Sequence, residues 1–532
     1  MNCNNCQQSF TIQTDDQEFY KKMIVPVPKL CADCRQQRRM AFRNEKTLYL
    51  RKCGLCQRNI LSIFSPDKNF TVYCEDCYWS DKWSAQKYAQ EFDFNQPFFE
   101  QLKELRKKVP QIALYKLSPT SENSDFANDI AHCKNSYLVF DGEGAQNCLY
   151  GETFYKINEC LDFYRLIKSE LCYECINCEN GYALRFCRFC ENCNNSWFLK
   201  DCKGCQNCFG CANLINQEYC IGNKQHTKED YDEFINNLNL GNHIELDKIK
   251  KKAEENFLRH PVKSVRGYKN EKSSGDNLYY CANSQYCFDS NELNNCRYCF
   301  QVMQGAKDSL DIDIWGQNVE NCYDCAGVGW EVRNIIASYY IFDKCHDIQH
   351  SIFCHRGCHD LFGCVGMQKA EYCILNKKYS EQEYKKLLPR VIAKCRQEGI
   401  YGQFFPVEFS MFSYNETIAY DYYPLTKKQV LANGWSWKEQ VIKSIDLSLP
   451  YCKSCNNNFK IIPQEKEFYR KLKLPEPLKC YNCRHLDRLK LRNPRKLWDR
   501  QCVKCKKDIK TTYHPNRLEI IYCEQCYLSA VM

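Results

Sequence analysis

Sixteen cysteines in Cys-x-x-Cys pairs are the residues of this sequence whose type and spacing point most clearly to chemistry. Four such pairs lie near each end of the 532-residue chain. Two pairs together supply four thiolates, the ligand set of a tetrahedral structural zinc site. A site with four protein ligands leaves no position for a substrate, so it stabilises a fold and does not catalyse a reaction. The predicted metal ligands are Cys3, Cys6, Cys31, Cys34, Cys53, Cys56, Cys74, Cys77, Cys452, Cys455, Cys480, Cys483, Cys502, Cys505, Cys523 and Cys526.

The two ends of the chain are copies of one module. Each C-terminal cysteine lies 449 residues after its N-terminal counterpart, so all eight recur without a gap. Other residues keep the same offset, including Glu18-Phe19-Tyr20, which returns as Glu467-Phe468-Tyr469. We therefore predict one double zinc-ribbon module at each end and about four structural zinc ions, with further metal in the middle of the chain left open.

An arginine face follows the second cysteine pair of each module. Arg35 and Arg39 are four residues apart and so share one side of a helix, as do Arg484 and Arg488 in the second copy. Such a face suits phosphate groups. The alternatives are a solvated helix side, or guanidinium groups that donate hydrogen bonds to metal-bound sulfur.

The C-terminal module is the basic part of the chain. The whole chain has a net charge of +9, while residues 450–532 hold 19 Lys and Arg against 8 Asp and Glu. Two zinc sites with four thiolates each remove about four units of charge, which leaves this module near +7. It is the better candidate for attraction to nucleic acid. The predicted nucleic-acid-binding residues are Arg484, Arg488, Lys490, Arg492, Arg495, Lys496 and Arg500.

The middle of the chain contains a second duplication. Phe209-Gly210-Cys211 matches Phe362-Gly363-Cys364, and each half ends in the start of a capped helix, at Thr227 and at Ser380. In the first half, seven cysteines between 133 and 220 are spaced by 15 or 12 residues. A short repeat without a helical period predicts the stacked turns of a β-solenoid, with cysteines as small buried apolar residues and asparagines hydrogen-bonded along the stack.

Two further metal hypotheses concern this middle. In the first half, closely spaced cysteines could instead bind more zinc or an iron–sulfur cluster. In the second half, a group rich in histidine could form a metal site with an open position, or could simply lie at the exposed edges of the solenoid turns. The first group is Cys172, Cys175, Cys178, Cys187, Cys190, Cys193, Cys202, Cys205, Cys208 and Cys211, and the second is His346, His350, Cys354, His355, Cys358 and His359.

These patterns predict a mainly β protein with small α parts. Duplicated zinc-ribbon modules at both termini flank a duplicated, cysteine-rich, solenoid-like middle. The expected segments are a double zinc-ribbon module at 1–80, a helical linker at 81–120, a first repeat half at 121–240, a helical linker at 241–270, a second repeat half at 271–400, an aromatic cap and connection at 401–449, and a double zinc-ribbon module at 450–532.

The bulk sequence indicates a soluble protein in a reducing, cytoplasmic compartment. It contains no apolar run long enough for a bilayer, and the N-terminus opens on a cysteine knuckle instead of a signal peptide, so no membrane partner is expected. The 42 cysteines occur in a long chain, which favours metal-bound or free thiols over a disulfide framework.

The first two cysteine pairs of each module resemble the probable zinc-ribbon domain family. The shared features are Cys-x-x-Cys, a Glu-Phe-Tyr helix, a proline-containing approach and Cys-x-x-Cys-Arg. The whole chain is also similar to a group of long, cysteine-rich bacterial proteins, which share segments such as Glu-Tyr-Cys-Ile-Leu-Asn-Lys at 371–377. The resemblance implies zinc binding at the ribbon cysteines and supplies no catalytic residues.

Three functions fit the sequence. The first is a non-catalytic protein that associates with RNA or DNA through its C-terminal module. The second is a scaffold that binds protein partners through the acidic, aromatic-rich middle. The third is an enzyme, either a metal-dependent nuclease or an iron–sulfur redox protein. The sequence has no Gly-rich phosphate loop and no Gly-x-Ser-x-Gly motif, so a catalytic role is the least expected.

Overall fold

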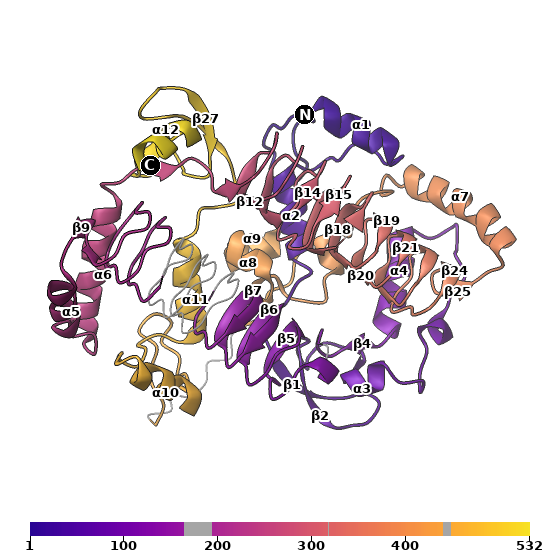
Figure 1. Cartoon of the computed structure of the whole chain (residues 1–532). Coiled ribbons are helices and arrows are strands. Elements are labelled where there is room, and N and C mark those ends of the chain that lie inside the picture. Colours follow the sequence, from indigo (N-terminus) through magenta and orange to yellow (C-terminus); the bar gives the residue numbers. More distant parts are fainter. Residues whose placement is uncertain (117, 164–193, 318, 440–447, 532) are drawn as a thin grey trace. The chain divides into compact units, whose positions relative to one another are not determined.

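The computed structural model describes the chain except for residues 117, 164–193, 318, 440–447 and 532 (Figure 1). The chain divides into two compact units, each assembled from separate segments. The first unit contains Met1–Leu114, Val265–Lys438 and Arg495–Leu497, and the second contains Tyr115–Ser264, Glu439–Pro494 and Trp498–Met532. The N-terminal module therefore shares a unit with the second half of the middle, and the C-terminal module shares one with the first half.

The first unit combines short helices with a long stack of parallel strands. Its helices are α1 (Thr14–Lys22), α2 (Ala32–Met40), α3 (Glu75–Tyr78), η1 (Ala85–Tyr88), α4 (Phe98–Lys108), α7 (Glu381–Gln397), η3 (Val407–Phe409), η4 (Tyr414–Glu416), α8 (Ile418–Tyr422) and α9 (Lys427–Ala432). Its strands are β1 (Tyr49–Lys52), β2 (Asn59–Ser62), β3 (Val72–Tyr73), β4 (Gln111–Ile112), β11 (Gly267–Tyr268), β12 (Gly275–Tyr279), β13 (Cys287–Asn291), β14 (Leu293–Asn294), β15 (Ala306–Lys307), β16 (Leu310–Gly316), β17 (Val319–Glu320), β18 (Tyr323–Gly329), β19 (Arg333–Ile336), β20 (Tyr339–Phe342), β21 (His346–Gln349), β22 (Ile352–His355), β23 (His359–Phe362), β24 (Glu371–Ile374) and β25 (Lys377–Lys378).

The second unit repeats this plan with fewer described strands. Its helices are η2 (Ser118–Thr120), α5 (Lys228–Asn236), α6 (His243–Phe257), α10 (Pro463–Lys471), α11 (Tyr481–Lys490) and α12 (Glu524–Val531). Its strands are β5 (Ala127–Ala131), β6 (Tyr137–Gln146), β7 (Leu149–Asn158), β8 (Cys220–Ile221), β9 (Lys224–Gln225), β10 (Val262–Lys263), β26 (Trp498–Gln501), β27 (Asp508–Thr511) and β28 (Ile521–Tyr522).

The predicted β-solenoid is confirmed, with a turn of twelve or thirteen residues. In β5, β6 and β7, Ala127 pairs with Val139, and Val139 pairs with Gly151 twelve residues later, all in parallel. In the second half some turns hold one residue more, because Tyr339 pairs with Ile352. The cysteine spacing of 15 residues is therefore longer than one turn and does not mark the repeat itself.

The solenoid turn is built from triplets. Every third residue has a positive φ, as at Asp129 (φ 56°), His132 (53°), Asn135 (51°) and Leu138 (51°). A left-handed residue at regular intervals bends an extended chain, so four triplets close one twelve-residue turn. Asn and Asp tolerate this conformation better than other non-glycine residues, which explains their frequency in the middle of the chain.

A new triplet begins after each residue with positive φ, and the side chain of its first residue points inward. Cys202, Cys205, Cys208 and Cys211 follow one another at this spacing, and each has 0% of its surface exposed. They join a single apolar core with neighbouring turns. Asparagines stack outside the core, where the Asn135 side-chain amide donates to Asn147 over 3.2 Å. The prediction of buried cysteines and an asparagine ladder is confirmed for the described residues.

The helices around the solenoids agree in part with the sequence. Thr227 caps α5, and Ser380 forms a full capping box at the start of α7, as predicted. The expected helical linker at 81–120 is helical only in part, and its described helices are η1, α4 and η2. No helix in the described part of the chain is long and apolar enough to cross a membrane.

Cys354, which is fully buried in the second half, tests whether the interior cysteines contribute packing alone. We expect Cys354→Ala to lower the free energy of unfolding by about 1 kcal/mol, since a small side chain replaces a slightly larger one. Cys354→Phe should cost more, because the closed turn has no room for a ring. Urea unfolding and metal analysis together decide the matter. Loss of a metal ion in the Ala variant would show that Cys354 is a ligand.

Candidate metal centres

Four clusters of cysteine sulfur atoms form the candidate metal centres. The structure brings together all sixteen predicted ligands, and within each cluster the sulfur atoms lie within 4.8 Å of one another. The clusters are Cys3, Cys6, Cys31 and Cys34; Cys53, Cys56, Cys74 and Cys77; Cys452, Cys455, Cys480 and Cys483; and Cys502, Cys505, Cys523 and Cys526. They lie at both ends of the chain and in both units.

Each cluster joins a tight turn to the start of a helix. Cys3 lies in a turn in which its amide donates to the Gln8 carbonyl and its own carbonyl accepts from Gln7. Cys31 occupies the N-cap of α2, and its amide donates to the Cys3 sulfur over 3.3 Å. The N-terminus of a helix carries partial positive charge, which stabilises a thiolate there. The Cys-x-x-Cys spacing brings the ligands together, and the start of the helix orients them.

The same geometry recurs at the other end of the chain. Cys480 occupies the N-cap of α11, and its amide donates to the Cys452 sulfur over 3.2 Å. Burial opposes ionisation of Cys452, yet hydrogen bonds from backbone amides lower its pKa to about 6. The pKa of Cys31 is lowered to about 5, chiefly by hydrogen bonding with the Cys34 sulfur. Cys31 and Cys452 thus favour the thiolate form that binds metal, whereas burial raises the pKa of Cys480 to about 11.

One sulfur–sulfur distance tests whether the clusters fit a metal ion. A tetrahedron with metal–sulfur bonds of about 2.3 Å has edges of about 3.8 Å. The Cys6 and Cys31 sulfur atoms are 3.8 Å apart, and so are those of Cys56 and Cys74. The corresponding pairs at the C-terminal end, Cys455–Cys480 and Cys505–Cys523, are both 3.7 Å apart. All four clusters have the dimensions of a four-thiolate metal site.

Comparison with known proteins agrees with this geometry. A family model described as a probable treble clef domain matches residues 1–43, which contain the whole first cluster. No curated protein matches the chain. The resemblance is thus confirmed at the N-terminus, as a treble clef domain similar to a zinc ribbon, and the four-cysteine clusters recur at the C-terminal end.

The arginine face of the N-terminal module lies against aspartates of the second half. Helix α2 contacts β16 and β18, and Figure 1 shows it near β18. Arg35 Nε lies 2.8 Å from a carboxylate oxygen of Asp311. Arg39 Nε lies 3.1 Å from Asp313, and its Nη1 lies 2.8 Å from Asp324. The Arg39 side chain is fully buried.

The second unit repeats this docking. Arg484 Nε lies 2.6 Å from Asp162, and Arg488 Nη1 lies 3.1 Å from the other oxygen of that carboxylate. In both units the first arginine of the face also stacks on a tyrosine ring. Arg35 lies over the ring of Tyr298 at 5.2 Å, and Arg484 lies over Tyr150 at 5.1 Å.

A third contact is shared by the two docking surfaces. The Tyr298 hydroxyl donates to Asp16 of α1 over 2.8 Å, and the Tyr150 hydroxyl donates to Glu465 of α10 over 2.6 Å. Asp16 and Glu465 occupy the same position in the two modules. Because both members of each contact are duplicated, the docking mode has been kept in both copies.

The charges at this interface are buried and balanced. Burial raises the pKa of Asp311 to about 6, although Arg35 and Arg39 oppose the rise. Burial also acts on Asp324, but Arg38 and Arg39 hold its pKa below the usual value. Removing charges from water costs several kcal/mol per ion, so the pairs hold only while both partners are present.

These contacts correct the predicted nucleic-acid face. Arg484 and Arg488 are buried against carboxylates, and they are not available to phosphate. Within the first unit, Arg495 pairs with Asp289 over 2.9 Å and stacks on Tyr422. Of the other predicted residues, Lys490 pairs with Asp487, Arg500 donates to the His514 carbonyl, Arg492 is partly exposed and Lys496 is exposed. The sequence pattern missed the aspartates that neutralise the face.

The histidine group of the second half is not assembled into a metal site in the described residues. The rings of His346 and His359 stack 5.0 Å apart on successive turns, each beside an aspartate. His350 is buried, and burial lowers its pKa to about 3. His355 shows the same shift for the same reason.

None of the described cysteines in the two predicted middle sites belongs to the four clusters. Cys354 and Cys358 are fully buried inside the solenoid. In the first half, the inward position of Cys202, Cys205, Cys208 and Cys211 follows from the triplet, and they belong to none of the metal clusters found among the described residues. Cys172, Cys175, Cys178, Cys187, Cys190 and Cys193 lie outside the described residues.

Breaking one docking pair should destabilise its unit. We expect Arg484→Leu to lower the free energy of unfolding by about 3 kcal/mol, because it leaves Asp162 buried without its closest partner. Arg470→Leu is the matched control, since Arg470 and Glu467 form an exposed pair on α10, and it should cost at most about 1 kcal/mol. Urea unfolding followed by tyrosine fluorescence measures both. Equal effects would contradict the buried docking pair.

Proposed function

We propose that this protein is a zinc-dependent, non-catalytic scaffold for protein partners. The proposal rests on one observation: both arginine faces form ion pairs with aspartates of the same chain. Charged side chains that would recognise an external polyanion are instead paired with Asp162 and Asp311 in the two units. Metal binding then holds the helices that dock on the solenoid halves. The exposed surfaces that remain are those of the assembled units, and these would bind protein partners.

Zinc is the metal that best suits these sites. Four thiolates at tetrahedral spacing are its usual structural ligand set, and the closed coordination supports a structural role. The C-terminal module has few buried apolar residues around its first cluster: between 451 and 480 they are Cys452, Ile461, Ile462, Tyr469, Leu472 and Leu474. In so small a unit the metal supplies much of the folding free energy.

Metal analysis of the full chain tests this proposal. We expect about four zinc ions per chain and no iron. Cys480→Ser should remove one zinc ion and release α10 and α11 from the first half, which limited proteolysis would detect. Cys395→Ser is a suitable control, since Cys395 is buried in α7 and belongs to no cluster. Stoichiometric iron, or a C480S variant with four zinc ions and an unchanged melting temperature, would refute the zinc scaffold.

Nucleic-acid association is a second candidate, supported by a different group of cations. Lys504, Lys506 and Lys507 are exposed around the Cys502–Cys505 turn. Three cations on one turn could contact a phosphate backbone without disturbing the docked arginines. This lysine turn replaces the predicted arginine face as the place where RNA or DNA would bind.

A salt series with the full chain separates the two candidates. If nucleic acid binds at the lysine turn, affinity for RNA or DNA should fall steeply with salt, and the triple variant K504E/K506E/K507E should abolish binding. K248E/K250E/K251E, on the solenoid helix α6, controls for net charge. No binding at low salt, or equal loss in both variants, would leave the protein scaffold as the remaining function.

A further inference from the structure

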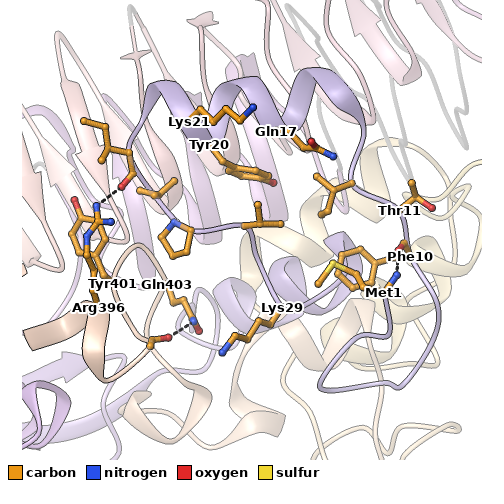
Figure 2. A pocket seen from close by; sticks show the side chains of 16 residues that line it. Met1, Phe10, Thr11, Gln17, Tyr20, Lys21, Lys29, Arg396, Tyr401 and Gln403 are labelled. Atoms are coloured by element: carbon orange, nitrogen blue, oxygen red, sulfur yellow. Dashed lines mark hydrogen bonds between the residues drawn. The ribbon is translucent and has the colours of Figure 1, made fainter. Parts of the chain in front are cut away.

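A groove lies beside the N-terminal module, within the first unit. Figure 2 shows it between helix α1, the chain that follows this helix, and the end of α7. Its volume is about 890 Å³, within the range of sites that bind ligands. None of its lining residues is a cluster cysteine or an arginine of α2.

The floor of the groove is apolar and open to solvent. Phe10, Ile12, Val25 and Pro26 are among its lining residues. At its edge, Ile24 has 68% of its surface exposed and Val27 has 43%. Exposed aliphatic residues grouped in a depression are typical of a binding site.

Cations surround this floor, and no lining residue is Asp or Glu. Figure 2 shows Lys21 on the helix, Lys29 below it and Arg396 at the far end. Lys21 and Lys29 form no ion pair among the described residues. Arg396 donates to the Ile24 carbonyl over 2.7 Å and stacks on Tyr401 at 4.7 Å. The groove is therefore complementary to a chain that carries both aliphatic and acidic side chains.

The second module provides an internal comparison for this surface. Ile24 corresponds to Lys473, and the two residues share the same left-handed backbone, with φ of 55° and 54°. Val27 corresponds to Glu476, which is charged. The module fold thus needs neither aliphatic residue. A β-branched residue with positive φ is strained, so an aliphatic residue at this position is not favoured by the backbone.

We propose that the groove binds an extended acidic and aliphatic segment of a partner protein. This deepens the proposed scaffold function and rests on it. The three cations lie on different sides of the floor, which suits carboxylates spread along a peptide. A fatty acid has a single carboxylate and would need its cations at one point. Aliphatic side chains of the peptide would pack on Ile24 and Val27, and its acidic side chains would face Lys21 and Lys29.

Selection from a random ten-residue peptide library displayed on phage tests the proposal with the full zinc-loaded chain. We expect enriched peptides to combine Asp or Glu with Leu, Ile or Val. The double variant I24K/V27E installs the residues of the second module and should weaken the enriched peptide at least tenfold. K21E/K29E should weaken it by a similar factor, and more strongly at low salt.

Two controls and the zinc content make the outcomes distinct. Leu50→Lys changes an exposed aliphatic residue of the same module outside the groove, and Lys52→Glu does the same for a cation; both should leave binding unchanged. All variants should keep four zinc ions and their melting temperature, so a failure of the zinc scaffold would appear there and not in peptide affinity. No enriched peptide, enrichment that survives I24K/V27E, or binding of dodecanoate alone would overturn the proposal.

Discussion

The buried pairing of arginine with aspartate is the interaction on which both units depend. Arg39 is fully buried, and the carboxylates of Asp311, Asp313 and Asp324 make that burial tolerable. The pairing demands accurate placement, because a charge that misses its partner in a dry interior costs several kcal/mol. The metal clusters position the arginines on one side of the interface, and the solenoid positions the aspartates on the other.

Metal and docking are linked through one short helix in each module. The second cysteine pair of the first cluster stands at the start of α2, and Arg35 and Arg39 follow on the same helix. Four thiolates fix the direction of that start, and the helix carries the direction to the guanidinium groups. On the other side, a turn of rigid triplets fixes Asp311 and Asp313. Free energy gained from metal binding thus contributes to the assembly of the whole unit.

The cysteine clusters could be predicted from the sequence, because the sixteen ligands lie in local pairs with known geometry. The solenoid could be predicted as a class, but its turn could not be read from the cysteines. Their spacings of 15 and 12 are both multiples of three, so they reported the triplet and not the twelve-residue turn. Asn and Asp at every third position were the signal that would have given it. The partners of the arginines were out of reach, because Arg35 and Asp311 are 276 residues apart. A cation pattern alone does not distinguish a phosphate surface from a buried pair.

The order of segments along the chain gives the two modules different histories during synthesis. The C-terminal module emerges when Asp162 and its solenoid half already exist, so it docks on a finished surface. The N-terminal module emerges first, and Asp311 follows 276 residues after Arg35. At about 5–20 residues per second, that interval lasts roughly 14–55 s. Throughout it, the aspartate partners of Arg35 and Arg39 are incomplete. Metal bound during synthesis would hold their helix over this interval, whereas the last two clusters form when their docking surface is already present.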